Sequence, residues 1–378
     1  MKSNKIRLGE QCVVTSSKRF HLSERITQGV PFYCSKEIIK KFNGEDVTEC
    51  DYISEDLYKK VSNEFGVPKE NDLLITTRGT IGIPYLYKRT DRFYFADGNL
   101  TWIKDFDSNL YSKFLYYWFQ SYEGRKKFEA LAKGTAQKAV PISGIKTLEI
   151  ELPSLKSQKR IADILSAYDD LIENNRKQIK LLEEAAQRLY KEWFVNLRFP
   201  GHENTKIVDG VPEGWHRGTI GQIAEFKRGR TITKAQVKEG NEPAYYHNVA
   251  NTKAPVITIS ASGANAGFVR LYGVDVFASD CSFVDGLGTE SLFFVYEFLK
   301  ESKVSIDQLQ KGSAQPHVYA KDINAMKITI PEKEYLERFD RYAKVYFNKI
   351  KTLQGQNERL KTARNLLLPK LMSGEAEV

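Results

Sequence analysis

The sequence has few of the features that mark secreted, membrane-spanning or metal-binding proteins. Its 378 residues include only four cysteines, none in a Cys-x-x-Cys pair or at zinc-ligand spacing from a histidine: Cys12, Cys34, Cys50 and Cys281. So few cysteines in so long a chain argue against a disulfide framework. No apolar run reaches the length of about 18 residues that a transmembrane helix needs, and the first residues lack the apolar core of a signal peptide. We therefore expect a cytoplasmic protein with no metal site and no membrane contact.

Two enzyme motifs are also missing. None of the 12 prolines is adjacent to another, which excludes the Asn/Asp-Pro-Pro-aromatic loop with which an amino-methyltransferase holds its target base. The G-x-x-x-x-G-K-[ST] phosphate loop of ATP-driven motors is absent as well. The five histidines are scattered without a nucleophile pattern; His317 stands out because it lies in a loop that we expect to face a ligand. We expect no catalytic residue and no cofactor in this chain.

The composition is that of a folded protein with a positive excess. Hydrophobic residues make up 41% and aromatic residues 12% of the chain, and the formal net charge is +9. Such a charge is compatible with a polyanionic partner such as nucleic acid, and equally with an ordinary soluble protein rich in lysine.

A heptad pattern organises the segment from Ser157 to Phe194, which contains neither glycine nor proline. Its apolar positions are Ile161, Leu165, Tyr168, Ile172, Ile179, Leu182, Ala186, Leu189 and Trp193, with Asn175 in the one polar step. The pattern predicts a helix roughly 48 Å long. A second helix is predicted from about Lys333 to Leu367, ending before Pro369, with the seam Phe339, Ala343, Tyr346, Ile350, Leu353, Asn357, Leu360, Arg364 and Leu367.

The chain contains an internal repeat of two similar halves. The run from Lys133 to Gln137 matches the run from Lys311 to Gln315, and the same shift of 178 residues carries Pro153 to Pro331 and one helical seam onto the other. Farther upstream, Leu8-Gly9 resembles Ile220-Gly221, and Thr77-Arg78-Gly79 resembles Ala261-Ser262-Gly263, with changed spacing. We therefore expect an α+β chain of two strand-rich globular domains, 1–156 and 198–331, each followed by a long helix, 157–197 and 332–378.

Local patterns predict the elements inside the globular domains. Strands are expected at 73–77, 81–87, 93–96, 148–152, 256–260, 275–278 and 326–330. Helices are expected at 111–131 and 291–302. Trp193, Phe194 and Leu197 are expected to be exposed at the end of the first long helix and covered by another protein.

The two helices must bury their seams, and each is the obvious partner of the other. An antiparallel pairing places Asn175 opposite Asn357 and Trp193 against Phe339. A parallel pairing would bury the Asn175 amide against Leu353, at a cost of about 1–3 kcal/mol for an unsatisfied group. We predict an antiparallel coiled coil with an Asn–Asn register contact; the alternative is that one or both amides face water. The antiparallel arrangement relates the globular domains by an approximate two-fold axis, as DNA half-sites are related.

Several short motifs now resemble one family. Pro212-Glu213-Gly214-Trp215, the two Gly-(Thr/Ser)-Ala-Gln loops, Arg188–Phe194 and Leu366–Gly374 resemble conserved regions of the specificity subunit of type I restriction–modification systems, and the ordered set covers essentially the whole chain. The resemblance implies two target-recognition domains that read the halves of a bipartite double-stranded DNA sequence, with the helices spacing the halves. It implies partner modification subunits, which bind S-adenosylmethionine and methylate adenine, and restriction subunits, which use ATP and Mg. The specificity subunit itself would perform no chemistry.

The DNA-contacting residues should be cations and amides in exposed loops, because lysine and arginine bind phosphates and arginine, lysine, asparagine and glutamine read base edges. The candidates in the two domains are Lys18, Arg19, Arg78, Lys88, Arg89, Lys133, Gln137, Lys138, Arg228, Arg230, Lys234, Arg270, Lys311 and Gln315. Arg78 stands out because it follows a buried strand in a tight turn. Two other functions stay open: a coiled-coil scaffold that binds proteins and not DNA, and a nuclease without a recognisable motif.

Overall fold

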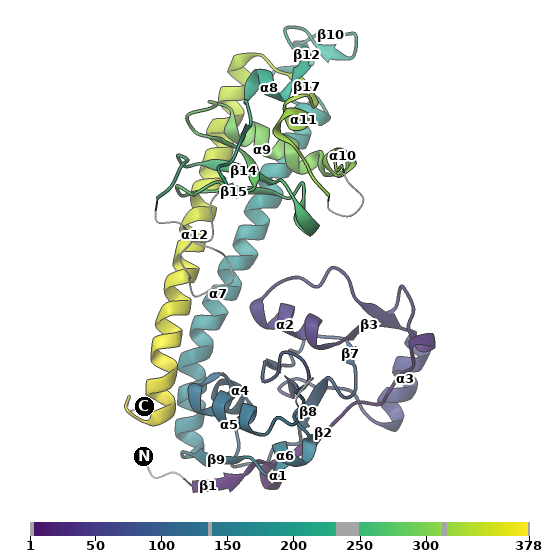
Figure 1. The fold of residues 1–378 in the computed structure, drawn as a ribbon, viewed down its shortest axis with the longest axis vertical. Coiled ribbons are helices and arrows are strands. Elements are labelled where there is room, and N and C mark those ends of the chain that lie inside the picture. Colours follow the sequence, from purple (N-terminus) through teal and green to yellow (C-terminus); the bar gives the residue numbers. More distant parts are fainter. Residues whose placement is uncertain (1–3, 135–137, 232–248, 312–315, 377–378) are drawn as a thin grey trace. The chain divides into compact units, whose positions relative to one another are not determined.

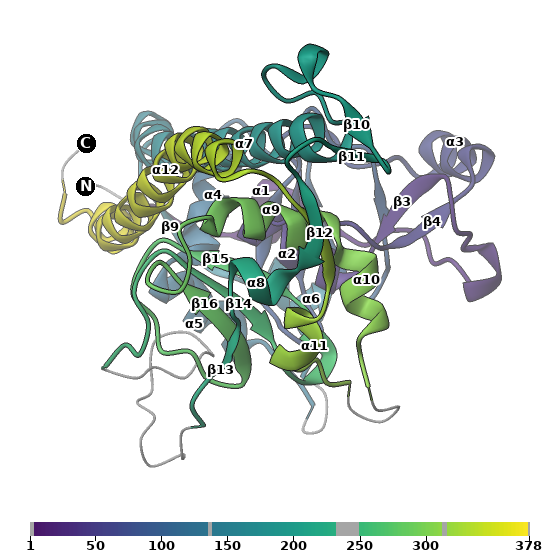
Figure 2. The same cartoon turned by 90° about the horizontal axis from the view of Figure 1, so that it is seen from above.

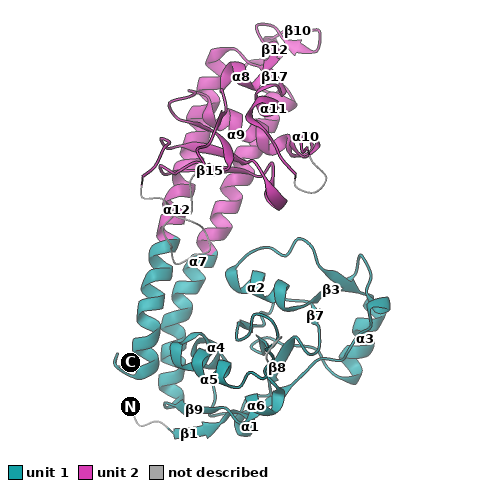
Figure 3. Cartoon of the chain, viewed as in Figure 1, with its two compact units in different colours: residues 1–173, 357–378 teal, residues 174–356 magenta. Residues whose placement is uncertain are grey.

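The computed structural model describes residues 4–134, 138–231, 249–311 and 316–376, and the chain divides into two compact units (Figure 3). Unit 1 comprises residues 1–173 and 357–378, and unit 2 comprises residues 174–356. Each unit contains one globular part and a segment of both long helices, α7 (Leu155–Tyr190) and α12 (Lys333–Ser373). The compact units thus divide both helices, whereas the segments expected from the sequence treat each helix as a separate piece.

An antiparallel four-stranded sheet forms the centre of unit 1 (Figure 1). Its strand order is β2 (Val13–Thr15), β8 (Leu100–Lys104), β5 (Leu73–Thr76) and β6 (Pro84–Leu86). Every residue of β5 is buried, which is why apolar residues occupy the successive positions from Leu73 to Ile75 and do not alternate with polar ones. The helices α4 (Ser112–Gln120) and α5 (Tyr122–Ala130) contribute Phe114, Phe119 and Phe128 to the same core.

Unit 1 also holds a smaller sheet, in which two strands come from residues 16–72, between β2 and β5 in the chain, and the third precedes β8. It has the order β4 (Asp51–Ile53), β3 (Val30–Tyr33) and β7 (Tyr94–Phe95). The helices α2 (Ser35–Asn43) and α3 (Glu55–Glu64) accompany it. The strands β3 and β4 were not expected from the sequence, because strands of three or four residues carry too little periodicity to recognise. The helices α2 and α3 were missed as well.

Unit 2 repeats the main sheet of unit 1 with the same order and the same antiparallel pairing. The corresponding strands are β13 (Lys227–Arg228), β16 (Cys281–Asp285), β14 (Val256–Ser260) and β15 (Val269–Tyr272). The helices α9 (Leu292–Glu301) and α10 (Lys303–Gln308) follow β16 in the chain, as α4 and α5 follow β8 in unit 1. A hairpin of β10 (Ile207–Val208) and β11 (Val211–Pro212) precedes the sheet. The repeat predicted from the sequence is therefore present in the strand topology.

A second strand pair recurs in both units and explains one of the upstream similarities. In unit 1, β1 (Asn4–Arg7) pairs with β9 (Glu149–Leu152); in unit 2, β12 (His216–Thr219) pairs with β17 (Lys327–Ile330). Figure 1 labels all four strands, and Figure 2 labels β9 and β12 in a second view. A short helix follows the first strand of each pair, α1 (Leu8–Gln11) and α8 (Ile220–Ile223), and another precedes the second strand, α6 (Ile142–Lys146) and α11 (Ala320–Asn324).

Glycine is needed where these short helices meet. A Cβ at Gly9 would lie 2.9 Å from the Cβ of Lys146, and one at Gly221 would lie 3.2 Å from the Cβ of Asn324. The two Leu/Ile-Gly pairs noted in the sequence thus allow the same close helix approach in both units.

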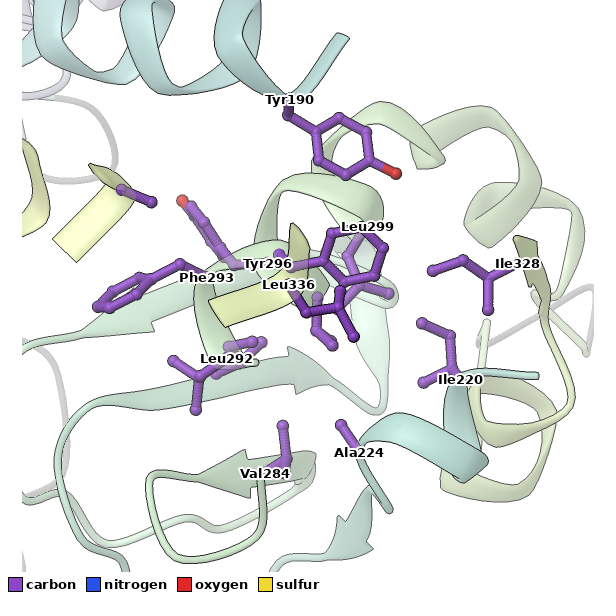
Figure 4. Close-up of a cluster of buried hydrophobic side chains, with 14 of the residues drawn as sticks. Tyr190, Ile220, Ala224, Val284, Leu292, Phe293, Tyr296, Leu299, Ile328 and Leu336 are labelled. Atoms are coloured by element: carbon purple, nitrogen blue, oxygen red, sulfur yellow. The ribbon is translucent and has the colours of Figure 1, made fainter. Parts of the chain in front are cut away.

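The two long helices run antiparallel within each unit, as predicted. In unit 2, the end of α7 meets the start of α12, and the rings of Trp193 and Phe339 are 6.1 Å apart. Figure 4 shows this region, with Tyr190, Leu336, Ile220 and Ile328 gathered in one apolar cluster. In unit 1, the start of α7 meets the end of α12: Leu165 and Leu368 share a core, and Arg364 forms an ion pair with Asp169.

Several element boundaries differ from the sequence prediction for identifiable reasons. The helix expected at 111–131 is divided at Ser121, whose hydroxyl accepts the Gly124 N–H and starts α5. Residues 275–278 are not a strand, because side chains of Asn251 and Thr252 occupy the backbone groups of Ala278 and Val276 that a ladder would use. The second long helix does not end at Pro369; it continues to Ser373 because Leu371 is buried in the core of unit 1.

The expectation that Trp193, Phe194 and Leu197 are exposed was wrong. Trp193 is buried and lies in a π-helical turn, Lys191–Val195, that extends α7. The rings of Phe194 and Trp215 are 5.8 Å apart, so the polypeptide after α7 folds back over this end of the helix. Part of unit 2 itself covers these side chains. No described helix combines the length and apolar character needed to cross a bilayer.

Candidate nucleic-acid interface

In unit 1, the loop that carries Lys133 and Lys138 is tied to the end of β5. The N–H groups of Lys133 and Ala139 each donate to the other residue's carbonyl, at 2.8 and 2.9 Å. Ala139 also forms a bridge with Arg78, and the Val140 N–H donates to the Thr77 carbonyl at 2.9 Å. Arg78, Lys133 and Lys138, three residues predicted to contact DNA, are thereby brought together by backbone hydrogen bonds.

A cavity of about 350 Å³ lies beside this tie. Arg78, Lys133, Ser16 and Thr77 line it together with apolar residues that include Leu100 and Val140. Within the described residues, neither Arg78 nor Lys133 forms an ion pair, and both are exposed. Two unneutralised cations beside an apolar floor suit a polyanion or the edge of a base.

Unit 2 contains the same backbone tie at the repeat-equivalent residues. Lys311 and His317 exchange two hydrogen bonds of 2.9 Å, Ser262 forms a bridge with His317, and the Val318 N–H donates to the Ala261 carbonyl at 2.9 Å. Every contact of the unit 1 tie has its counterpart. The second upstream similarity in the sequence, around Arg78 and Ser262, therefore marks one structural position in two domains.

The side chains presented by the two ties differ in chemistry. Arg78 of unit 1 is replaced by Ser262 of unit 2, and Ala139 is replaced by His317, whose ring stacks on Tyr319 at 6.0 Å. A third difference lies at the residue that accepts the next backbone hydrogen bond. That residue is Asn99 in unit 1, where the Thr77 N–H donates to its carbonyl, and Asp280 in unit 2, where Ala261 donates.

The remaining unit 1 candidates lie at two other places. Lys18 and Arg19 follow β2; the Lys18 ammonium is 4.6 Å from the centre of the Phe65 ring, and Arg19 forms an ion pair with Asp97 at 2.9 Å. Lys88 and Arg89 follow β6, so they lie at the end of the β5–β6 pair opposite to Arg78. Lys88 forms an ion pair with Glu173 on α7.

The unit 2 candidates also divide into groups. Arg228 and Arg230 lie beside the start of β16: Arg228 pairs with Ser282, and the Arg230 N–H donates to the Ala278 carbonyl at 3.0 Å. The Arg270 guanidinium is 4.8 Å from the centre of the Phe268 ring. Lys311 is neutralised by Asp322 at 3.0 Å. Gln137, Lys234 and Gln315 lie outside the described residues.

The groups whose pKa values are strongly raised either lie away from the two backbone ties or stay protonated. Burial raises the pKa of the Cys12 and Cys281 thiols to about 12 and about 11, so both stay protonated. Burial also raises the pKa of Glu297 to about 8; this carboxyl lies in the core of unit 2, and its Oε2 has no hydrogen-bond partner among the described residues. Among those residues, no three His, Cys, Asp or Glu side chains converge to hold a metal ion.

The two asparagines of the helical seam are both buried, Asn175 at 7% and Asn357 at 5% exposure. Within unit 2, the Asn175 amide donates to Oε1 of Gln356 at 3.5 Å. Gln356 immediately precedes Asn357 in the chain.

Comparison with known proteins places this architecture in a family. The sequence model of the type I restriction modification DNA specificity domain matches residues 3–184 and 212–362. The chain belongs to this family, that of the specificity subunits of type I restriction–modification systems. Its two matched segments each contain one of the four-stranded sheets and one of the backbone ties described above.

Individual relatives agree with this assignment. The chain is similar to the specificity subunit of the type I restriction enzyme MjaIX of Methanocaldococcus jannaschii, with 27% identity over 301 residues that cover 71% of this chain and 69% of that protein. It is also similar to a putative type I specificity subunit of Mycoplasma genitalium, with 26% identity over 327 residues and 82% coverage of each. The crystal structure of a type I system S subunit from M. genitalium shares the fold, with a TM-score of 0.62, 19% identity and coverage of 98% of this chain and 96% of that chain.

Sequence reasoning missed Asn99 and Asp280. Asp280 is neither a cation nor an amide, and the spacing upstream of the repeated loops differs between the two domains, so no fixed shift aligns Asn99 with Asp280. Asn99 lies 21 residues after Arg78, whereas Asp280 lies 18 after Ser262. Only the hydrogen-bond ladder shows that the two residues are equivalent.

Proposed function

We propose that unit 1 and unit 2 each read one half of a bipartite double-stranded DNA target, in a type I restriction–modification complex. The supporting observation is that the two units share a sheet order and a backbone tie but present different side chains at that tie. Such a design supplies a constant scaffold and a variable reader. Unpaired cations supply affinity through phosphates, and the tie residues supply selectivity at base edges.

The test is a comparison of methylated motifs in a host with and without the gene for this chain. A bipartite methyladenine motif should disappear with the gene. In addition, binding of the purified complex to duplex DNA should weaken with salt at a log–log slope of several units. A binding constant that did not respond to salt, or a methylome unchanged by deletion, would contradict the proposal.

We infer that the partner subunits dock on the long helices. In unit 1, Leu171 and Leu366 are 51% and 66% exposed on α7 and α12; in unit 2, Leu181 and Val345 are 64% and 65% exposed. Exposed aliphatic side chains on helices are suited to covering by another protein. The partners would be modification subunits that hold S-adenosylmethionine and restriction subunits that use ATP and Mg, so the chain itself would need no cofactor.

Co-purification can test this docking. Leu366→Glu should lower the amount of methyltransferase subunit that co-purifies with the chain. Leu287, which is 81% exposed at a turn of unit 2, provides the control, since Leu287→Glu adds the same charge away from the helices. Equal loss with both variants would argue against the helices as the docking site.

We also propose that Asn175 and Asn357 are the polar register positions of the two helical seams. Burial of both amides and the contact of Asn175 with Gln356 support it, and one matched polar pair in an apolar seam disfavours shifted registers. The helices would then fix the number of bases between the two half-sites. Cytoplasmic location is supported by the four cysteines, all described and none in a disulfide.

A further inference from the structure

Asp280 lies next to the backbone tie of unit 2, which we expect to face DNA. It directly precedes β16, and its carbonyl accepts the Ala261 N–H at 3.0 Å. The next residue along from Ala261 is Ser262, which bridges to His317 in the backbone tie. Asp280 is therefore adjacent to the residues that replace Arg78 and Ala139 of unit 1.

The carboxylate of Asp280 is held in a fixed orientation although it is exposed. The Ser262 hydroxyl donates a hydrogen bond to its Oδ2. The backbone of Asp280 has a φ of 44°, in the left-handed region that non-glycine residues other than Asn and Asp rarely adopt. One side-chain oxygen is thus used by Ser262, and the other oxygen is available to accept a hydrogen bond from a ligand.

The negative charge of Asp280 cannot contribute to DNA affinity through phosphate contacts. A carboxylate repels phosphates, and no described lysine or arginine forms an ion pair with Asp280. Arg228 and Arg230, by contrast, lie beside the same strand end and can bind phosphates. Among the groups on major-groove base edges, only the exocyclic amino groups of cytosine and adenine donate to a carboxylate.

We propose that Asp280, positioned by Ser262, selects a base with an exocyclic amino group, cytosine N4 or adenine N6, in the half-site read by unit 2. This inference rests on the proposed DNA-reading function and makes it specific. In unit 1, the equivalent places hold Asn99 and Arg78, and Arg78 donates to acceptors such as guanine O6 and N7. The two half-sites are therefore read with opposite hydrogen-bond polarity at the tie.

The test uses the full chain assembled with its modification subunits and a DNA duplex carrying the methylated motif. Each cytosine and adenine of one half-site is replaced in turn by an analogue that lacks the exocyclic amino group. With the wild-type complex, the analogue should lower DNA affinity about 10- to 100-fold at one position of the unit 2 half-site, the range for one good base contact. Asp280→Ala should show no such loss at that position, and its methylated motif should be relaxed there alone.

Two further variants keep the test decisive. Asp280→Gly removes both carboxylate oxygens and tolerates the φ of 44° at this position, so it reports on the acceptor even if Asp280→Ala unfolds; it should also lose the discrimination. Asp307→Asn removes an exposed carboxylate of α10 that is already paired with Lys303, and it should leave the motif unchanged.

The outcomes separate the two levels of inference. Normal, motif-specific methylation by Asp280→Gly with unchanged discrimination would overturn the role of Asp280 and leave the two-reader function intact. Relaxation of both half-sites by this one substitution would instead contradict the two-reader function itself. The proposal would also be overturned if no amino-group deletion in the unit 2 half-site lowered the DNA affinity of the wild-type complex.

Discussion

The two units have the same scaffold and differ at its reading end. Both carry an antiparallel four-stranded sheet and a loop that is tied to the end of a buried strand by the same hydrogen bonds. The residues that complete the tie are cationic in unit 1, at Arg78, and neutral or acidic in unit 2, at Ser262 and Asp280. Backbone hydrogen bonds do not depend on side-chain identity, so this architecture allows the reader to change while the fold is retained.

The largest expected effect comes from equivalent core positions of the two units. Ile161 and Phe339 are related by the repeat shift, and both are almost completely buried. Phe339→Ala should lower the free energy of unfolding by about 3–5 kcal/mol, since Phe339 packs against Trp193 and Phe194. Ile161→Ala should cost about 2–5 kcal/mol. Hydrogen exchange should locate the loss of protection in unit 2 for the first variant and in unit 1 for the second; identical exchange maps would refute two separable cores.

A second contrast concerns pH, because Glu297 is buried in unit 2. Its folded-state pKa is raised to about 8 by burial, from an ordinary value of 4.5. The unfolded chain therefore releases this proton at lower pH than the folded chain, and the stability of unit 2 falls as pH rises from about 4.5 to about 8. Glu297→Gln should leave stability near pH 4 unchanged and raise it by roughly 2–4 kcal/mol at pH 9. Thermal unfolding at the two pH values checks this; equal stabilisation at both would contradict it.

A third prediction concerns the reading end of unit 1. Arg78→Ala should reduce base discrimination in one half-site by about 1–3 kcal/mol and leave the other half-site unchanged. Sequencing of methylated motifs produced by the variant complex provides the measurement. Relaxation of both halves would contradict the assignment of one half to each unit.

The smallest effect is expected at Lys88, which lies at the opposite end of the β5–β6 pair. Its charge is already partnered by Glu173, and exposed ion pairs contribute about 0–1 kcal/mol. Lys88→Ala should change DNA affinity by less than about twofold and leave the salt slope unchanged, whereas Lys133→Ala should lower that slope by about one. Titrations at three salt concentrations distinguish the two variants, and a reduced slope for Lys88→Ala would place this residue in the interface.

The two long helices and their pairing could be predicted from the sequence, whereas the short strands and helices of the insertion could not. The seams of α7 and α12 span many turns, so their periodicity predicted two antiparallel helices and the contact of Trp193 with Phe339. The insertion with β3, β4, α2 and α3 was missed because its elements are short. The grouping of Arg78 with Lys133 depends on a hydrogen-bond bridge to Ala139, which leaves no trace in local sequence.

Residue type alone gave an incomplete picture where tertiary packing decides the outcome. Lys88 and Lys311 were equal candidates with Arg78 by residue type, yet each has an acidic partner in another element: Glu173 on α7 for Lys88 and Asp322 on α11 for Lys311. Pro369 signalled a helix end, but burial of the residue two positions later keeps α12 helical. Asp280 was overlooked because a search for DNA contacts among cations and amides excludes carboxylates.

The division of both long helices between the units has a consequence for synthesis of the chain. Unit 2 is continuous in sequence, from residue 174 to residue 356, whereas unit 1 requires residues 357–376 to complete its core. Domains commonly fold in the order in which they leave the ribosome. Here the upstream globular part must wait, with Ile161 and Leu165 lacking their cover from Leu368 and Leu371, until the downstream part has been made. A chain that ended after residue 356 would therefore contain all of unit 2 and would lack the part of α12 that completes unit 1.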